Sequence, residues 1–322
     1  MIRMPRFVLA AALAAISQLA AAQAFPDRSV RVVVVDPPGS AVDVVARLLS
    51  DQLASRWKQQ AVVENRPGAS GTIAANIVAK SKPDGLTFFM TGTFTEAIVP
   101  FAMEKMPYDY RKDLVPIAEV ARLPFVLVVS STSALQNLND VATFAKGKAG
   151  GLTVGGLPRG SSLHLTWEII AERMGIPSTY VAYNSSNQLQ TDVLSGQFDI
   201  AIDTIGSARG FIGSGRTRGM AITSAVRSSA LPGVPTLEEN GQRGLEVIVW
   251  VGALAPAGTP ADRMSVLEQS LIDAARADSV KAKLSEFGYI VTGRTGAEMT
   301  ETIRTDRLRF EPLVKRLGIK MN

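Results

Sequence analysis

The chain has 322 residues, of which 46% are hydrophobic and 20% charged, and it carries a formal net charge of +5. This composition is typical of a globular protein, and the length indicates two domains. The chain has no cysteine, which excludes disulfides, a lipid anchor on an N-terminal cysteine and thiolate metal sites. Because the charges are interspersed rather than gathered in a basic block, we expect no nucleic-acid partner.

Residues 1–24 have the pattern of a secretory signal peptide. Two arginines precede an unbroken apolar run over residues 7–16, and residues 22–24 form a small-x-small cleavage site. The run is shorter than the roughly 20 apolar residues that a bilayer-spanning helix needs. We therefore expect export to the periplasm and cleavage after Ala24, with Ala22 as the alternative site.

Short apolar runs and amphipathic segments alternate from residue 30 onward. The first run is rich in β-branched side chains and stops at a Pro-Pro-Gly turn, a pattern that predicts a buried strand. Strands that alternate with helices predict a parallel sheet with βαβ crossovers. The predicted strands span residues 30–35, 61–64 and 86–91, and the predicted helices span residues 41–57 and 72–80.

The pattern restarts after Pro124 and predicts a second sheet. Its strands are expected at residues 125–130, 152–155, 180–183, 198–203 and 219–223, and its helices at 139–146, 161–174, 187–194 and 207–214. The last hundred residues predict a strand and then a helical block, which we expect to pack on the first sheet. That strand spans residues 247–255, and the helices span 260–277, 279–287 and 297–317.

These elements predict an α/β fold of two lobes, each a mixed, mostly parallel sheet flanked by helices. Residues 25–123 and 226–322 are expected to form a discontinuous first lobe. Residues 124–225 would then form an inserted second lobe. The two crossings, near Leu123-Pro124 and Ala225, are the expected hinges.

The sequence offers little support for catalysis. His164 is the single histidine, which excludes a histidine metal cluster, and no Gly-x-Ser-x-Gly elbow is present. The glycine-rich loop 68–71 lacks the Lys-Ser/Thr pair of a phosphate loop, and Pro158 spoils a dinucleotide fingerprint at Gly155-Gly156. We expect His164 to lie on a helix face with a local hydrogen bond, and the protein to bind a ligand without catalytic residues, metal or cofactor.

Small residues gather in five loops that directly follow predicted strands. In open α/β sheets, ligands bind at the carboxyl ends of strands, where helix N-termini present free amide donors to anions. One such loop would be an ordinary tight turn, but five loops across two lobes favour a ligand cleft. The loops span residues 37–43, 67–72, 91–95, 155–161 and 183–187.

Short motifs along nearly the whole chain carry a resemblance to a known family. They lie at residues 33–39, 43–47, 63–68, 83–85, 106–109, 164–165, 231–236 and 256–260 and at Trp250. Each is weak alone, but their order and spacing are specific. The chain resembles the Bug family, the substrate-binding proteins of tripartite tricarboxylate transporters. This resemblance implies a two-lobed periplasmic-binding-protein fold, similar to type II, that closes on its ligand.

The resemblance also implies where the ligand binds. Family members hold a carboxylate through amides, hydroxyls and waters of first-lobe loops, and second-lobe loops select the rest of the molecule. In this sequence the corresponding first-lobe residues are Asp36, Pro38, Gly39, Ser40, Ala41, Gly68, Ala69, Ser70, Thr91, Thr93 and Phe94. The second-lobe residues are Gly156, Arg159, Ser161, Tyr183, Asn184, Ser185 and Asp203.

The expected partners follow from the same resemblance. We expect a monomer that binds a small organic acid, or an amino-acid or pyridine-type ligand, and delivers it to membrane permease subunits. The alternative is a sensing role, in which the loaded protein is presented to a membrane sensor kinase. The sequence of the binding protein alone does not separate these two roles.

The sequence departs from the family pattern at several expected ligand positions. Asp36 stands where an aromatic or uncharged residue is usual, and Ser40 replaces a glycine. Gly156 stands in place of serine, Pro158 in place of glycine, and Asn184-Ser185 in place of Lys-Gly. Drift within a large family and a ligand other than a simple dicarboxylate both explain these departures.

Asp36 is the departure with the clearest chemical consequence. An ionised carboxylate at the cleft edge would repel a ligand carboxylate and favour an amine, amide or pyridinium-like group nearby. Two other roles are open. Asp36 could point away and cap the helix that begins near Ala41, or it could pair with Arg66 or Arg159.

Overall fold

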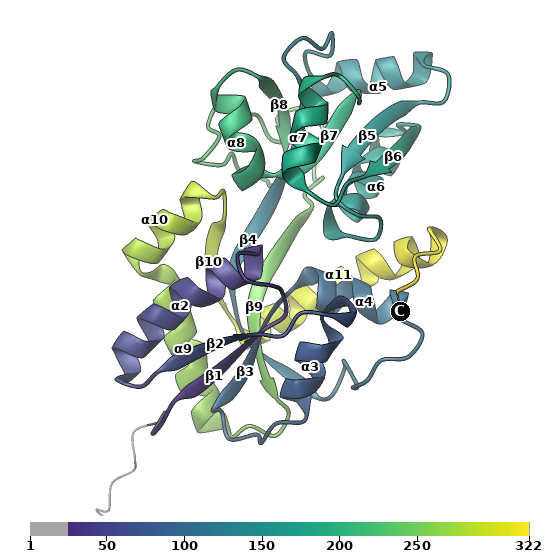
Figure 1. Cartoon of the computed structure of the whole chain (residues 1–322). Coiled ribbons are helices and arrows are strands. Elements are labelled where there is room, and N and C mark those ends of the chain that lie inside the picture. Colours follow the sequence, from purple (N-terminus) through teal and green to yellow (C-terminus); the bar gives the residue numbers. More distant parts are fainter. Residues whose placement is uncertain (1–24, 322) are drawn as a thin grey trace, which may run out of the picture.

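The computed structural model describes residues 25–321, so the expected signal peptide, residues 1–24, lies outside the described residues. Figure 1 shows two lobes joined by long strands. Strand β4 (Leu114–Ser130) runs from one lobe into the other, and β9 (Ile248–Pro256) lies beside it. The two-lobed α/β architecture predicted from the sequence is confirmed. Within residues 25–321, no helix combines the length and the apolarity needed to cross a bilayer.

The lower lobe in Figure 1 is built on a mixed sheet with the order β2-β1-β3-β9-β4, and β10 pairs with the other edge of β4. Strands β1 (Val30–Val34), β2 (Ala61–Asn65) and β3 (Thr87–Gly92) are parallel. Strands β9, β4 and β10 (Ile290–Thr295) alternate in direction. β1 lies between two parallel neighbours and is almost entirely valine, because a strand covered on both faces does not alternate polar and apolar residues.

Helices cover both faces of this sheet. On one side α2 (Ala41–Trp57) packs with α9 (Ala261–Arg276) and α10 (Asp278–Glu286); on the other lie α3 (Thr72–Ala79), α4 (Val99–Ala102) and α11 (Gly296–Arg316). Two short helical segments follow the parallel strands, the 3-10 helix η1 (Ala69–Gly71) after β2 and the π-helix η2 (Phe94–Ile98) after β3. The C-terminal helices α9, α10 and α11 therefore pack on the lobe that the N-terminal strands begin.

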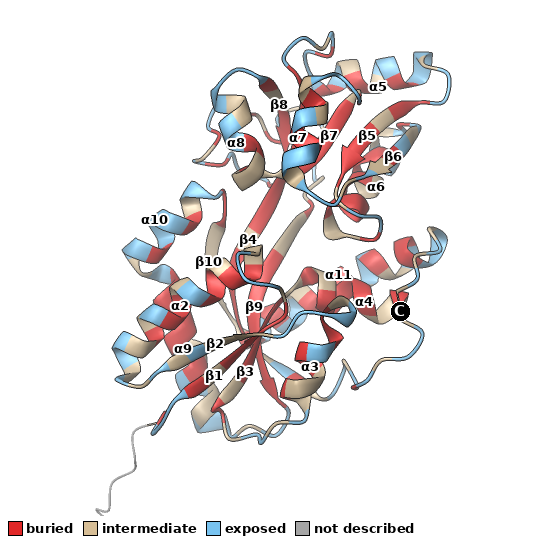
Figure 2. Cartoon of the chain, viewed as in Figure 1, coloured by how far each residue is buried: buried red, intermediate tan, exposed pale blue. Residues whose placement is uncertain are grey.

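The upper lobe repeats this plan with the order β6-β5-β7-β4-β8. Strands β5 (Leu152–Gly156), β6 (Ser178–Ala182) and β7 (Ile200–Thr204) are parallel, whereas β4 and β8 (Thr217–Ile222) alternate in direction. Four helices flank this sheet: α5 (Leu138–Gly147), α6 (Ser162–Met174), α7 (Ser186–Leu194) and α8 (Ile205–Gly213). Figure 2 shows that the strands of both sheets are mostly buried beneath helices with exposed outer faces.

Strand β4 is much longer than its sequence predicts. The pattern predicts residues 125–130, yet the strand begins at Leu114. Pro116 lacks an N–H donor and Glu119 carries a charge, and both features disfavour a strand interior. In the structure, Pro116 lies at a shift in the register between β4 and β9. Glu119 is completely buried, and its Oε1 lies 2.7 Å from Nε of Arg122. The sequence pattern also does not predict β10, η2 or α4.

The loop between β8 and β9 packs on the upper lobe. Its side chains Leu231 and Val234 are buried in one cluster with Val126 and Ile222. The backbone of this loop also pairs with β8, since Leu237 N donates to Ile222 O at 2.9 Å. We therefore propose that the second crossing between the lobes lies at the start of β9 rather than at Ala225.

The burial of Glu119 gives a stability prediction. The carboxylate lies 2.7 Å from Arg122 and 3.7 Å from Arg294, so Glu119→Ala would leave partly buried guanidinium groups uncompensated. We expect the free energy of unfolding to fall by about 3–5 kcal/mol, the usual cost of breaking a buried ion pair. Denaturant titration of both proteins measures this difference in the free energy of unfolding. Glu301→Ala removes an exposed partner of Arg304 and is the control, for which the change should be far smaller. Equal losses in the two variants would contradict the structural role of Glu119.

Candidate functional site

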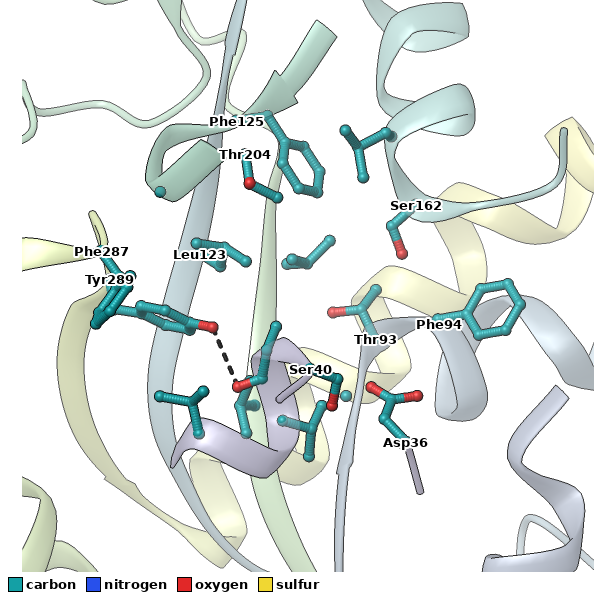
Figure 3. A pocket seen from close by; sticks show the side chains of 18 of the residues that line it. Asp36, Ser40, Thr93, Phe94, Leu123, Phe125, Ser162, Thr204, Phe287 and Tyr289 are labelled. Carbon is teal, nitrogen blue, oxygen red and sulfur yellow. Dashed lines mark hydrogen bonds between the residues drawn. The ribbon is translucent and has the colours of Figure 1, made fainter. Parts of the chain in front are cut away.

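A cleft of about 730 Å³ lies where the two lobes face each other. Figure 3 shows side chains of the lower lobe, such as Asp36 and Tyr289, and of the upper lobe, such as Ser162 and Thr204, around it. The crossing strands form its back wall. The lining residues are Asp36, Gly39, Ser40, Ala41, Val42, Val44, Gly92, Thr93, Phe94, Phe287 and Tyr289 from the lower lobe, Leu157, Ser161, Ser162, Leu163, Ser186, Thr204, Gly206 and Ser207 from the upper lobe, and Leu123, Phe125, Val249, Trp250 and Val251 from β4 and β9.

Four helices begin at this cleft. The lining includes the first residues of α2 in the lower lobe and of α6, α7 and α8 in the upper lobe. Each helix follows the carboxyl end of a parallel strand, so the βαβ topology aims all four N-termini at the same space. The first-turn amides of a helix have no intrahelical partner, and the helix dipole adds partial positive charge. The cleft is therefore suited to bind an anion.

Hydroxyl side chains set where three of these helices start. Ser40, Ser161 and Thr204 are the N-caps of α2, α6 and α8. Each accepts a hydrogen bond from the third helical amide, at 3.3 Å for Ser40 and Ser161 and 3.4 Å for Thr204. This capping occupies one amide of each first turn and leaves the earlier amides facing the cleft.

Among the described residues that line the cleft, Asp36 is the only one with a charged side chain. Burial, together with the charge of Asp43, raises the pKa of the half-buried Asp36 carboxyl. Burial would also raise the pKa of Asp43, but hydrogen bonds from Arg47 and from the Gly39 amide lower it overall. The pKa values of these two neighbouring acids therefore shift in opposite directions, because Asp43 has an arginine partner and lies away from the cleft.

The remaining walls are largely apolar. Phe94, Leu123, Phe125 and Phe287 face the space between the helix ends (Figure 3). Such walls favour the body of an organic molecule, while the few polar groups fix its orientation. In the part of the chain that the structure describes, no group of three or more histidine, aspartate or glutamate side chains is arranged to hold a metal ion.

Seven of the residues expected at the site line this cleft: Asp36, Gly39, Ser40, Ala41, Thr93, Phe94 and Ser161. The other expected residues do not line it, and they are Pro38, Gly68, Ala69, Ser70, Thr91, Gly156, Arg159, Tyr183, Asn184, Ser185 and Asp203. Several of these have structural roles. The Arg159 guanidinium donates to Tyr180 O at 2.8 Å, the Tyr183 hydroxyl donates to Asp192 at 2.6 Å, and buried Asp203 accepts from Gln190 at 2.8 Å.

Two segments supply cleft residues that sequence reasoning missed. Thr204 ends β7, and Gly206 and Ser207 lie in the first turn of α8, so their place after the predicted strand 198–203 was a usable signal. Phe287 and Tyr289 reach the cleft from the connection between α10 and β10. Nothing local marks them, because their position depends on how the C-terminal helices return to the first sheet.

His164 has the local role that the sequence predicts. It is buried on α6, and its Nδ1 accepts a hydrogen bond from the Gly160 amide at 3.0 Å. Its ring centroid lies 4.4 Å from that of Tyr180. His164 therefore stabilises the loop before α6, and it does not line the cleft.

Comparison with known proteins agrees with this architecture. The family described as "Tripartite tricarboxylate transporter family receptor" matches residues 45–319. The chain is 34% identical to a UPF0065 protein of Bordetella bronchiseptica, over 97% of this chain and 93% of the relative. It is similar to an R. palustris protein solved with adipate, with 30% identity, a TM-score of 0.77, and coverage of 92% of this chain and 99% of the other. It is also similar to MatC from Rhodopseudomonas palustris with bound malate, with 27% identity, a TM-score of 0.73, and coverage of 90% and 100%.

A buried acid lies behind the cleft loop that contains Thr93 and Phe94. Glu96 in η2 is fully buried, 3.7 Å from the guanidinium of Arg307. Burial raises the pKa of Glu96 to about 7, although the charge of Arg307 opposes this rise. Thr91, on β3 just before this loop, is also fully buried and does not line the cleft.

This raised pKa predicts how stability changes with pH. The pKa of Glu96 is about 7 in the folded state and near 4.5 when unfolded, so between these values the folded state binds the extra proton. The stabilisation that comes from protonated Glu96 is fully present below about pH 4.5. As the pH rises through about 7 this stabilisation is lost, and the free energy of unfolding falls by up to about 1.4 kcal/mol per pH unit. Glu96→Gln should remove this component. Urea titrations of both proteins from pH 4.5 to 8 test it, and parallel stability profiles would contradict it.

Proposed function

The chain belongs to the tripartite tricarboxylate transporter receptor family, and from this premise we propose that it captures a small organic acid and delivers it to membrane permease subunits in the periplasm. The family and the solved relatives are solute-binding proteins rather than enzymes, in agreement with the sequence analysis. The resemblance to this family that the motifs indicate is confirmed. Adipate and malate in two solved relatives support an acid as the ligand class.

The convergence of four helix N-termini on one cleft is the observation that supports this function best. Three of these helices begin in the upper lobe and one in the lower lobe, so an anion between them is attracted by both. A ligand held this way stabilises the state in which the lobes approach each other. Apolar walls from β4 and β9 then accommodate the carbon skeleton.

The proposed export signal has a direct test. Phe25, the first described residue, already packs in the fold, since the Arg263 guanidinium lies 5.3 Å from its ring centroid. Cleavage after Ala24 would leave Phe25 at the N-terminus of the mature protein. N-terminal sequencing of the protein from a periplasmic fraction should begin at Phe25. A start at Met1, or recovery only from the cytoplasm, would overturn the proposed export.

Ligand binding in the cleft predicts a stabilisation that a single substitution abolishes. Small carboxylic acids should raise the melting temperature, because a ligand that binds the folded state stabilises it. Gly206→Leu places a side chain in the cleft at a helical position where a Cβ meets Phe287 at an ordinary 3.4 Å. We expect it to abolish the ligand-induced shift. Gly210→Leu on the same helix meets no atom within 4 Å of its Cβ and is the matched control.

The outcomes of this screen separate the alternatives. A shift that survives in Gly206→Leu would place the ligand outside the cleft. Stabilisation by sugars, nucleotides or cations alone would contradict the carboxylate class. Loss of the shift in both glycine variants would indicate damage to α8 rather than obstruction of the cleft, and circular dichroism of the unliganded variants would detect that damage.

Lobe closure is a second consequence of this function. Two polar pairs join the lobes on either side of the cleft, and Leu165 of α6 is also buried against Phe310 and Leu313 of α11. The Arg209 guanidinium donates to Glu286 O at 2.5 Å, and Arg316 lies 2.8 Å from Glu172. A ligand that binds both lobes should shift the population toward this closed arrangement. Small-angle X-ray scattering should therefore show a smaller radius of gyration with saturating ligand.

A double variant, Arg209→Ala with Arg316→Ala, separates closure by the ligand from closure by these pairs. Without ligand it should have a larger radius of gyration than the unmodified protein, and ligand should still compact it. An unchanged radius of gyration in both proteins, with and without a bound acid, would overturn the closure mechanism.

A further inference from the structure

The charge arrangement of the cleft is asymmetric. The upper lobe directs the N-termini of α6, α7 and α8 at it, whereas the lower lobe places the carboxylate of Asp36 beside the start of α2. Figure 3 shows this carboxylate at the edge of the ligand space near Ser40 and Phe94. The two ends of the cleft therefore favour opposite charges.

Asp36 does not serve the other roles that its sequence position allows. The N-cap of α2 is Ser40, whose hydroxyl accepts from the Asp43 amide. Arg66 pairs with Glu64, and Arg159 donates to a backbone carbonyl of the upper lobe. Among the described residues, no hydrogen bond or ion pair holds the Asp36 carboxylate.

The backbone at Asp36 is nevertheless well fixed. The Asn65 side-chain amide donates to the Asp36 carbonyl oxygen at 2.9 Å and to Asp43 at 2.8 Å. The strand β1 that precedes Asp36 is buried in the sheet. The carboxylate is thus presented to the cleft by a rigid segment, as a group that selects a ligand must be.

We propose that Asp36 is a specificity-determining residue that selects, among small organic acids, those with an ammonium or similar N–H donor at the end opposite their carboxylate. This inference rests on the proposed function, because it assumes a carboxylate held by the helix ends. The ligand lies with its carboxylate toward the upper lobe, its apolar body against β4 and β9, and its donor on Asp36. This orientation reverses the one that the resemblance to the family implies, because Asp36 places a negative charge in the lower-lobe loop. A partly buried carboxylate gains a charge-assisted hydrogen bond from such a ligand.

The same residue acts against the symmetrical diacids. A second ligand carboxylate at the Asp36 end would bring two like charges together in a partly desolvated space, and this lowers affinity. An uncharged methyl end would leave the Asp36 carboxylate without a partner. Ligands with the same carbon skeleton should therefore bind in the order ammonium, methyl, carboxylate.

Matched probes test this order. Calorimetry should compare three compounds that share one carboxylate and a chain, which are 6-aminohexanoate, hexanoate and adipate. The shorter set of 4-aminobutanoate, butanoate and succinate and the aromatic set of 4-(aminomethyl)benzoate, 4-methylbenzoate and terephthalate cover other lengths. In at least one set the amine should bind about tenfold or more tightly than the diacid, the scale of one hydrogen bond to a charged group.

Substitution of the acid should reverse the preference. In Asp36→Asn the shape is retained and the charge is lost, so affinity for the amine should fall about tenfold or more while affinity for the diacid rises. Asp51→Asn, an exposed acid on α2, is the control and should leave the order unchanged. If Asp36→Asn does not fold, Asp36→Ser serves the same comparison, and the melting temperature without ligand reports folding.

The outcomes distinguish this inference from the proposed function. If diacids or methyl compounds bind as tightly as amines in every set, or if Asp36→Asn leaves the order unchanged, the role of Asp36 is overturned and carboxylate binding stands. If none of the nine compounds binds, the carboxylate proposal fails and the inference fails with it.

Discussion

The pairing of β4 with β9 is the constraint on which the rest of the structure depends. The ladder runs antiparallel from Leu114 opposite Pro256 to Pro124 opposite Ile248. Beyond Pro124, β4 leaves β9 and pairs with β7 and β8 instead, so one strand belongs to both sheets. The lobes are therefore joined by hydrogen-bonded strands rather than by loose linkers.

The crossing strand β9 also connects the cleft with helix α11 on the outside of the lower lobe. Trp250 lies at the crossing, where its backbone amide donates to Thr93 Oγ1 and its indole Nε1 donates to Asp306 on α11, both at 2.9 Å. The same strand lines the cleft at Val249 and Val251. The crossing strand β9 is therefore hydrogen-bonded to both the cleft loop at Thr93 and the helix α11.

How much was predictable from the sequence depends on whether the signal was local. The lobes, most strands and the cleft loops at Gly39–Ala41 and Thr93–Phe94 follow from apolar periodicity and strand-end glycine, serine and threonine residues. The first half of β4 was missed because Pro116 and Glu119 disfavour a strand unless a bulge and two arginines, the neighbouring Arg122 and the distant Arg294, accommodate them. Phe287 and Tyr289 were missed because their place in the cleft depends on long-range packing.

The expected site residues outside the cleft illustrate the same limit. A small residue after a strand is equally suited to a ligand or to a close neighbour, and only packing decides between them. A Cβ on Gly156 would meet the Tyr180 hydroxyl at 2.1 Å, so this glycine makes room for a buried tyrosine. Gly68 likewise has a φ of 124°, and Ala69 and Ser70 have φ values of 44° and 54°, so this loop is defined by its turn geometry.

The absence of a cationic side chain among the described cleft residues has a consequence for how a ligand is held and released. Helix amides attract an anion through fixed partial charges that need no desolvated lysine or arginine. Because three of the helix ends belong to the upper lobe and one to the lower lobe, the attraction weakens as soon as the lobes separate and water enters the cleft. A carrier must bind tightly when closed and release readily when opened. Dipoles divided between two lobes meet both needs, whereas a buried arginine on one lobe would retain the ligand after opening.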